Sequence, residues 1–158
     1  MNDDRPQNAG KMMQLLDLEL SEREIYFIGR IVAAWGALES EIFMQTLLAL
    51  NPNSLDDLPS DMKNNLQPSC VRKHWKAHVV DKASGERQEI LLEQHDKIEA
   101  LSEDRHAIVH GMWEYSKSEP EKITVWRVRK GDLEKKVFTA DDLMNISLAV
   151  YHSNKILN

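Results

Sequence analysis

The sequence predicts a mainly α-helical protein, a bundle of four to five helices with a small β-hairpin before the C-terminal helix. Three observations support this fold class. Apolar residues recur at three- and four-residue spacing, two segments carry the pattern that caps a helix N-terminus, and one segment alternates apolar and polar residues. With 158 residues the chain has the size of one domain, so a single domain over 1–158 is expected.

The first long helix is expected over 21–50. Ser21 and Glu24 form a capping box, in which each side chain satisfies a free backbone N–H group at the helix start. Behind them, apolar residues recur every three or four positions until Pro52 ends the pattern. The preceding segment, 1–20, is polar and then rich in Met and Leu, and is expected to form an arm or a short docking helix.

The middle of the chain is predicted to be helical but interrupted. Residues 51–59 contain two prolines and two asparagines, which is typical of a loop. A less regular helical stretch is expected over 60–80, broken near Pro68 because proline has no backbone N–H group to donate. A third helix is expected over 86–111. Ser102 leaves its continuity open, since this side chain could cap a second helix or lie in solvent.

The C-terminal part of the sequence changes its period. Residues 122–139 alternate apolar and polar side chains around Gly131, which favours a β-hairpin inserted before the last helix. Thr139 and Asp142 then repeat a capping pattern, and apolar residues at helical spacing follow to the end of the chain.

Composition and charge narrow the function classes. A formal net charge of -6 argues against binding nucleic acid by bulk attraction to phosphate, so any such contact has to be local. The single cysteine, Cys70, excludes a disulfide framework and favours a reducing compartment. No apolar stretch approaches the roughly 18 residues of a membrane span, and the first residues lack the apolar segment of a signal peptide. We therefore expect a soluble, cytoplasmic protein without a membrane partner.

The densest group of reactive side chains lies at 103–110, which contains two acids, an arginine and two histidines. On a helix, His106 and His110 lie about 40° apart around the axis, whereas Arg105 and His110 lie about 140° apart. One helix alone is therefore not expected to bring Arg105 to His110. A twofold partner could do so, because an isologous interface presents the same patch twice.

The segment Arg105-His-Ala-Ile-Val-His110 resembles the Arg-x(4–6)-His motif of the HEPN superfamily, in the form with a polar residue directly after the arginine. Gly111 and the Trp-Gly-Ala-Leu-Glu sequence at 35–39 resemble the same group. The resemblance covers about 21–111 and the last helix, and 122–139 departs from it. It implies a small helical bundle that dimerises through its motif helices, and in many members a metal-independent ribonuclease.

The motif residues suit this chemistry. RNA carries its own nucleophile, the 2′-hydroxyl, so cleavage needs proton transfer and positive charge at the phosphate but no metal. A histidine, whose ordinary pKa is near ~6.5, can exchange a proton at neutral pH. His110 is therefore the candidate proton-transfer group, His106 its helper, and Arg105 the phosphate-binding group, with Glu39 and Asp104 as supporting acids. The alternative is that Arg105 pairs with one of these acids and that the histidines are ordinary polar residues.

Two basic groups, each beside a tryptophan, are candidate RNA contacts. The candidates are Arg127, Arg129 and Lys130 near Trp126, and Arg72 and Lys73 near Trp75. The alternative for each group is a solvated face whose tryptophan packs inward. Arg72 and His78 also satisfy the looser spacing of the HEPN motif.

A metal site is a separate hypothesis. Cys70, His74 and His78 recur every four residues and would share a helix face, which favours zinc. Cys70 and His78 would lie about 12 Å apart, so one ion could take only two of the three and would need ligands from elsewhere. The motif histidines have metalloprotease spacing, but Ala107 replaces the catalytic glutamate of that motif. We expect no cofactor, and no metal at the motif.

The sequence thus predicts a metal-independent endoribonuclease, a toxin or defence effector that cuts RNA at a site shared by the two protomers of a homodimer. A cognate antitoxin protein is a further candidate partner. Ile108, Val109 and Met112 are expected at the dimer interface, with Trp35 or Trp113 nearby, and the equally supported alternative for each is a position in the core. The alternative function is a non-catalytic HEPN-type module that binds a protein or a nucleotide with the same side chains.

Overall fold

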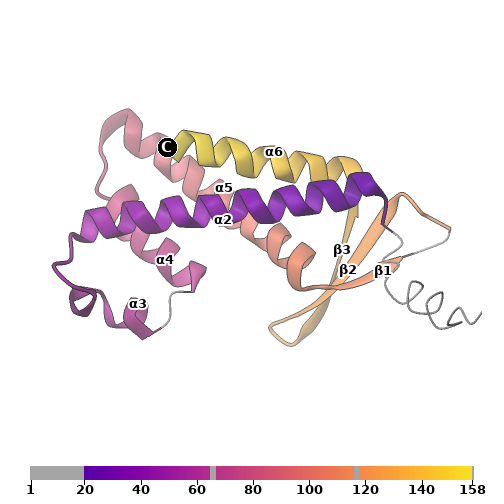
Figure 1. Cartoon of the computed structure of the whole chain (residues 1–158), viewed down its shortest axis with the longest axis horizontal. Helices are drawn as coiled ribbons and strands as arrows, with labels where there is room; N and C mark the ends of the chain where they lie inside the picture. Colours follow the sequence, from indigo (N-terminus) through magenta and orange to yellow (C-terminus); the bar gives the residue numbers. More distant parts are fainter. Residues whose placement is uncertain (1–19, 65–66, 116–117, 158) are drawn as a thin grey trace, which may run out of the picture.

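The computed structural model describes residues 20–64, 67–115 and 118–157. The protein is mainly helical, with a small antiparallel sheet before the C-terminal helix, which confirms the predicted fold class (Figure 1). The arm or docking helix expected over 1–20 lies outside the described residues, apart from Leu20. No helix in the described ranges combines the length and the apolar character needed to cross a membrane.

Helix α2 (Glu22–Leu50) begins at the predicted capping box. The Ser21 hydroxyl accepts a hydrogen bond from the Glu24 backbone N–H at 3.2 Å, and the Glu24 carboxylate accepts one from the Ser21 N–H at 2.6 Å. The helix ends at Asn51, which adopts the left-handed conformation (φ 46°) and donates its N–H to the Leu47 carbonyl. Both ends therefore follow from local side-chain and backbone chemistry.

The interrupted middle segment is also as predicted. A 3-10 turn (Leu55–Asp57) and the short helix α3 (Ser60–Asn64) precede α4 (Pro68–Trp75), which continues into a π-helical segment (Lys76–Val80). Pro68 occupies the first turn of α4, where its missing N–H group has no helical partner to lose. Trp75 is fully buried and donates its indole N–H to Gln45 of α2 at 2.9 Å, which fixes α4 against α2.

Helix α5 (Gly85–His110) is continuous through Ser102, which settles the question of a break. The Ser102 hydroxyl donates to the Glu99 carbonyl at 2.8 Å, so this polar side chain is satisfied within the helix instead of capping a new one. The helix ends at Gly111. A Cβ atom there would lie 2.1 Å from Val125 Cγ1 and 2.5 Å from the Ala107 carbonyl oxygen, so only glycine fits at this turn.

The sheet contains the predicted hairpin and one further strand. Its strands, in spatial order, are β1 (Met112–Tyr115), β2 (Lys122–Arg129) and β3 (Asp132–Thr139). Lys130 and Gly131 both have positive φ (51° and 91°) and form the two-residue turn between β2 and β3. The sequence did not predict β1, because four residues are too few to show an alternating pattern and the strand directly follows a long helix.

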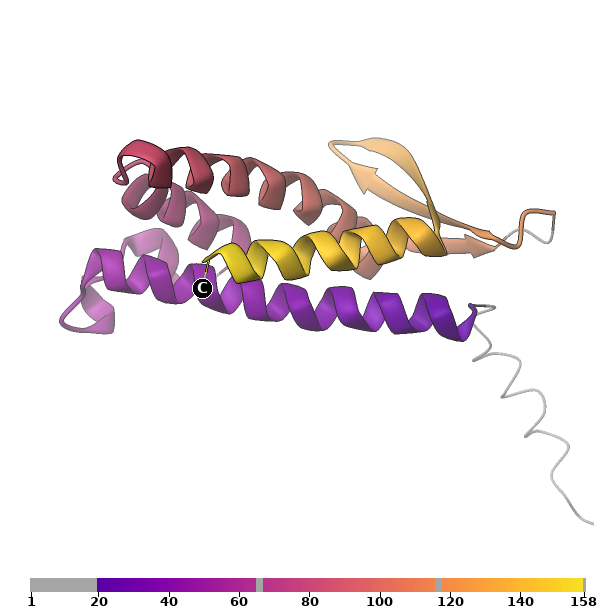
Figure 2. The same ribbon diagram turned by 90° about the horizontal axis from the view of Figure 1, so that it is seen from above.

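Helix α6 (Ala140–Leu157) runs parallel to α2 along its whole length, while α5 lies alongside in the opposite direction (Figures 1 and 2). An ion pair between Arg23 and Asp141 (2.6 Å) joins the two helix starts, and Gln45 donates to the Leu157 carbonyl near their ends. Buried residues of the helices and of strands β2 and β3 form one core, which includes Ile31, Trp35, Leu38, Trp75, Ile98, Ile108, Val125, Leu143 and Val150.

Candidate functional site

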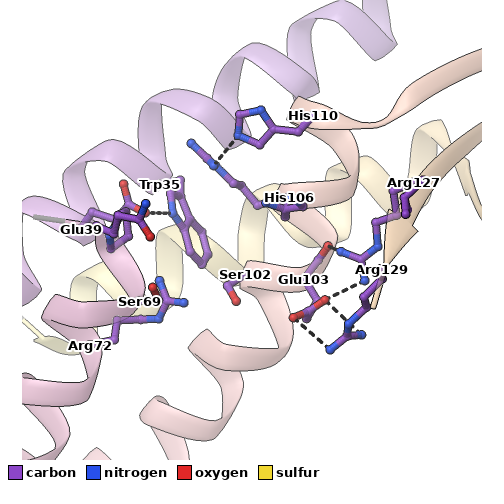
Figure 3. Close-up of a pocket in the computed structure, with 14 residues that line it drawn as sticks. Trp35, Glu39, Ser69, Arg72, Ser102, Glu103, His106, His110, Arg127 and Arg129 are labelled. Atoms are coloured by element: carbon purple, nitrogen blue, oxygen red, sulfur yellow. Dashed lines mark hydrogen bonds and ion pairs between the residues drawn. The ribbon is translucent and has the colours of Figure 1, made fainter. Parts of the chain in front are cut away.

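A cavity of about 580 Å³ opens where the end of α5 meets α2, α4 and strand β2 (Figure 3). Its walls are rich in arginine and histidine. The lining residues that the sequence had singled out are Glu39, Arg72, Arg105, His106, His110, Arg127 and Arg129. Residues far apart in the sequence therefore share one cavity.

Within this cavity, Arg105 and His110 are in direct contact. Arg105 Nη1 lies 3.3 Å from His110 Nε2 in the same chain, so the expectation that one helix cannot bring them together is wrong. The helical angle describes the Cβ directions, whereas the arginine side chain is long and His110 is the last residue of α5. A guanidinium donates and cannot accept, so the contact requires a lone pair on His110 Nε2.

Arg105 differs from the other arginines of the cavity in its partners. Its guanidinium forms no ion pair with a carboxylate in the described part of the chain, and its buried Nε atom has no hydrogen-bond partner there. The alternative in which Arg105 pairs with Glu39 or Asp104 is therefore not the arrangement seen. Glu39 instead accepts the Trp35 indole N–H at 2.5 Å, and Asp104 accepts from Lys136 at 2.5 Å outside the cavity lining.

Arg127, by contrast, is 8% exposed and already paired. It contacts the Glu103 carboxylate at 2.7 Å, the Glu134 carboxylate at 2.9 Å and the Glu103 carbonyl oxygen at 3.3 Å (Figure 3 draws the bonds to Glu103). The hydrogen bond from Arg127 lowers the pKa of Glu103, and the Glu103 carboxylate raises the pKa of Arg127. Arg129, 3.3 Å from Glu103, belongs to the same network. Arg127 and Arg129, both candidate RNA contacts, therefore line the cavity with their positive charges balanced by these carboxylates.

The remaining basic candidates lie in different surroundings. Arg72 is buried, lines the cavity and pairs with Glu99 at 2.6 Å. Lys73 is exposed on α4 and lies 3.6 Å from Asp61, and Lys130 occupies the β2–β3 turn. The structure does not bring Lys73 or Lys130 to the cavity lining.

His106 lies next to His110, with 4.9 Å between the ring centroids. Burial lowers the pKa of His106 below its ordinary 6.5, and the neighbouring His110 and Arg127 act in the same direction. The surroundings of His106 therefore favour its neutral form more than those of an ordinary histidine.

The sequence did not identify several uncharged residues that shape the cavity. Trp35, nearly fully buried, forms part of the wall beside Glu39, and Ser69 and Ser102 contribute hydroxyl groups (Figure 3). The serines belong to no recognisable motif, and the sequence placed Trp35 near a dimer interface or in the core, not in the wall of a cavity.

The chain matches no family model, no curated protein and no solved structure. Its function is therefore inferred from the chemistry of the arginine- and histidine-rich cavity.

Proposed function

We propose that the protein is a metal-independent endoribonuclease whose cavity binds a phosphate of RNA, in keeping with the resemblance of its motif to the HEPN superfamily. The observation that carries this proposal is the contact between Arg105 and His110, in which the guanidinium has no carboxylate partner among the described residues. An arginine without a carboxylate can offer its paired N–H groups to two phosphate oxygens.

Arg105 exchanges its partner when RNA binds. Its contact with His110 is long at 3.3 Å, and a charged phosphate is a stronger acceptor than a neutral imidazole. When the guanidinium moves to the phosphate, the lone pair of His110 Nε2 becomes free. The two residues are thus prepared for different tasks: Arg105 stabilises negative charge and His110 accepts a proton.

In the proposed reaction, His110 takes the proton of the 2′-hydroxyl, and the 2′-oxygen forms a bond to the adjacent phosphorus. The bond from phosphorus to the 5′-oxygen of the next nucleotide breaks, and that oxygen takes a proton from solvent water. The products are a 2′,3′-cyclic phosphate and a free 5′-hydroxyl. His110 then gives the accepted proton to solvent, which returns it to its starting form. His106, with its ring centroid 4.9 Å from that of His110, is the candidate helper that orients it.

The test is incubation of the purified full-length chain with RNA in excess EDTA, followed by analysis of the product ends. We expect cleavage with cyclic 2′,3′-phosphate ends and none of DNA, which lacks the nucleophile. Arg105→Ala should lower the rate by roughly 10²-fold or more while unfolding like the wild type. His78→Ala, from the second match to the motif, is the control and should stay active.

The non-catalytic module is the alternative, and the same experiment separates it. If no RNA is cut under any condition, while Arg105→Ala weakens binding of a nucleotide, the cavity is a binding site without proton transfer. One observation favours this alternative: Arg72, Arg127 and Arg129 are engaged with carboxylates, which leaves a single arginine for the transition state.

The homodimer is part of the proposal, although Arg105 meets His110 within one chain. Ile108 and Trp35, expected near the interface, are buried in the core and cannot form it. Met112 and Trp113 are exposed directly after the motif helix and are the candidate contacts between protomers. Light scattering of the purified chain should give the mass of two protomers at micromolar concentration. The toxin or effector role, the antitoxin partner and the cytoplasmic location stay predictions.

A further inference from the structure

Outside the cavity, α3 and α4 bring three metal-binding side chains together. Asp61 of α3 and Cys70 and His74 of α4 have ligand atoms that all lie within 4.8 Å of one another. His74 Nε2 lies 2.9 Å and 3.0 Å from the two Asp61 carboxylate oxygens. Within 20–64, 67–115 and 118–157 this is the one such group of at least three residues.

The geometry of this group is close to that of a zinc site. Zinc binds sulfur at ~2.3 Å and nitrogen or oxygen at ~2.1 Å, so two ligands of a tetrahedral ion lie roughly 3.3–3.7 Å apart. The three ligand atoms already lie within 4.8 Å of one another, so the change needed to reach that separation is small. The combination of thiolate, imidazole and carboxylate favours zinc over magnesium or calcium, which prefer oxygen ligands alone.

Asp61 supplies the ligand that the sequence pattern lacked. Cys70, His74 and His78 cannot all reach one ion, and the structure places His78 against the His74 ring, with centroids 5.8 Å apart, without including it in the group. The two residues one helical turn apart, Cys70 and His74, are instead completed by a carboxylate from another helix. The spacing of Cys70, His74 and His78 had indicated that a zinc ion would need a further ligand from outside this helix.

Other roles for these side chains explain the cluster less well. The Cys70 thiol lies against the Asp61 carboxylate, and a neighbouring negative charge opposes formation of a reactive thiolate nucleophile. Cys70 is also the single cysteine of the chain, so it has no disulfide partner within it. The Asp61 carboxylate is hydrogen-bonded to both His74 and Cys70, so the three side chains already converge on one point, and a bound ion would replace these hydrogen bonds. Lys73, whose Nζ lies 3.6 Å from Asp61, is highly exposed and free to move away from an incoming ion.

We propose that Asp61, Cys70 and His74 bind one zinc ion, with water as the fourth ligand, and that the ion fastens α3 to α4. The same helix, α4, contributes Pro68, Ser69 and Arg72 to the wall of the cavity. Zinc therefore stabilises that wall from outside and touches none of the groups proposed for RNA cleavage. The site goes beyond the proposed ribonuclease and does not depend on it.

The test uses Co²⁺, which occupies zinc sites and reports its ligands by absorption. The full-length protein, freed of metal by a chelator, should bind one equivalent of Co²⁺ with an intense tetrahedral spectrum and a sulfur-to-cobalt charge-transfer band. Zn²⁺ should displace the cobalt and raise the melting temperature, because it binds the folded chain. In Cys70→Ser the charge-transfer band should be absent.

Matched variants identify the other ligands. Asp61→Asn and His74→Gln should each weaken Zn²⁺ binding by about tenfold or more, whereas His78→Gln, the adjacent histidine outside the group, should bind like the wild type. A wild-type cobalt spectrum without the sulfur band would overturn the proposal, as would unchanged Zn²⁺ affinity in His74→Gln. Because RNA cleavage is assayed in EDTA, failure of the zinc site and failure of the ribonuclease are separate results.

Discussion

The two walls of the cavity each carry an arginine, and the two arginines differ in whether a carboxylate pairs with them. On the β2 wall, Arg127 is paired with the carboxylates of Glu103 and Glu134, whereas at the end of α5 the side-chain hydrogen bond of Arg105 among the described residues is to a histidine. The comparison teaches that the partner, and not the arginine itself, determines its role. A guanidinium whose charge is already balanced holds elements together, and one without a carboxylate is available to an anionic ligand.

The paired wall joins elements that are distant in sequence. Arg127 lies on β2, Glu134 on β3 and Glu103 on α5, so a single buried guanidinium fastens the hairpin to the motif helix. This arrangement places the hairpin beside His106 and His110.

The largest expected effect is that of removing His110, the only side-chain hydrogen-bond partner of Arg105 among the described residues. His110→Ala removes the proposed proton acceptor and should lower the rate of RNA cleavage by roughly 10²-fold or more, with little change in unfolding. Cleavage rates measured under single-turnover conditions check this. Retention of wild-type rates in His110→Ala would remove this histidine from the mechanism.

The next effect tests the tight turn at Gly111, which connects the motif helix α5 to the sheet. Gly111→Ala places a Cβ atom 2.1 Å from Val125 Cγ1 and close to a backbone carbonyl, so the free energy of unfolding should fall by about 2–3 kcal/mol. Gly36→Ala is the matched control, because nothing lies within 4 Å of its added Cβ. In the middle of α2 it should stabilise the protein by about 0.5–1 kcal/mol. Urea unfolding measures both, and equal effects would contradict the tight turn at Gly111.

The paired wall itself is tested by removing its arginines one at a time. Arg127→Ala leaves two carboxylates without their shared partner and should lower the free energy of unfolding by about 2 kcal/mol, since the carboxylates are partly exposed. Arg129, 44% exposed, should contribute less than about 1 kcal/mol. Urea unfolding of the two variants compares them, and a smaller loss for Arg127→Ala would contradict the network.

The smallest expected effect is a pH dependence. Because the folded protein lowers the pKa of His106 below 6.5, the folded state binds fewer protons than the unfolded state as the pH falls. Stability should therefore be full above that value and decrease as the pH falls through the lowered pKa. In His106→Gln this part of the decrease should be absent. Unfolding free energies between about pH 7 and about pH 5 measure it, and identical slopes would argue against a lowered pKa.

Local features of the fold were predictable from the sequence. The capping pairs Ser21 with Glu24 and Thr139 with Asp142 depend on residues three positions apart and occur as expected. Strand β1 was not predictable, because its pairing depends on β2, which lies further along the chain.

The candidate site was predictable only in part. The motif spacing identified Arg105, His106 and His110, and all three line one cavity. The ion-pair state of Arg127 could not be predicted, since Glu103 comes from another element. Asp61 was missed for the same reason, because it joins Cys70 and His74 only when α3 packs against α4.

The most direct measurement compares Arg105→Ala with Arg129→Ala, two arginines of one cavity, for RNA cleavage in EDTA at matched folded fraction. Arg105→Ala should lose roughly 10²-fold or more of the cleavage rate, and Arg129→Ala less than about tenfold, because its charge is already paired. An inactive Arg129→Ala beside a fully active Arg105→Ala would contradict the claim that the unpaired arginine acts on the substrate.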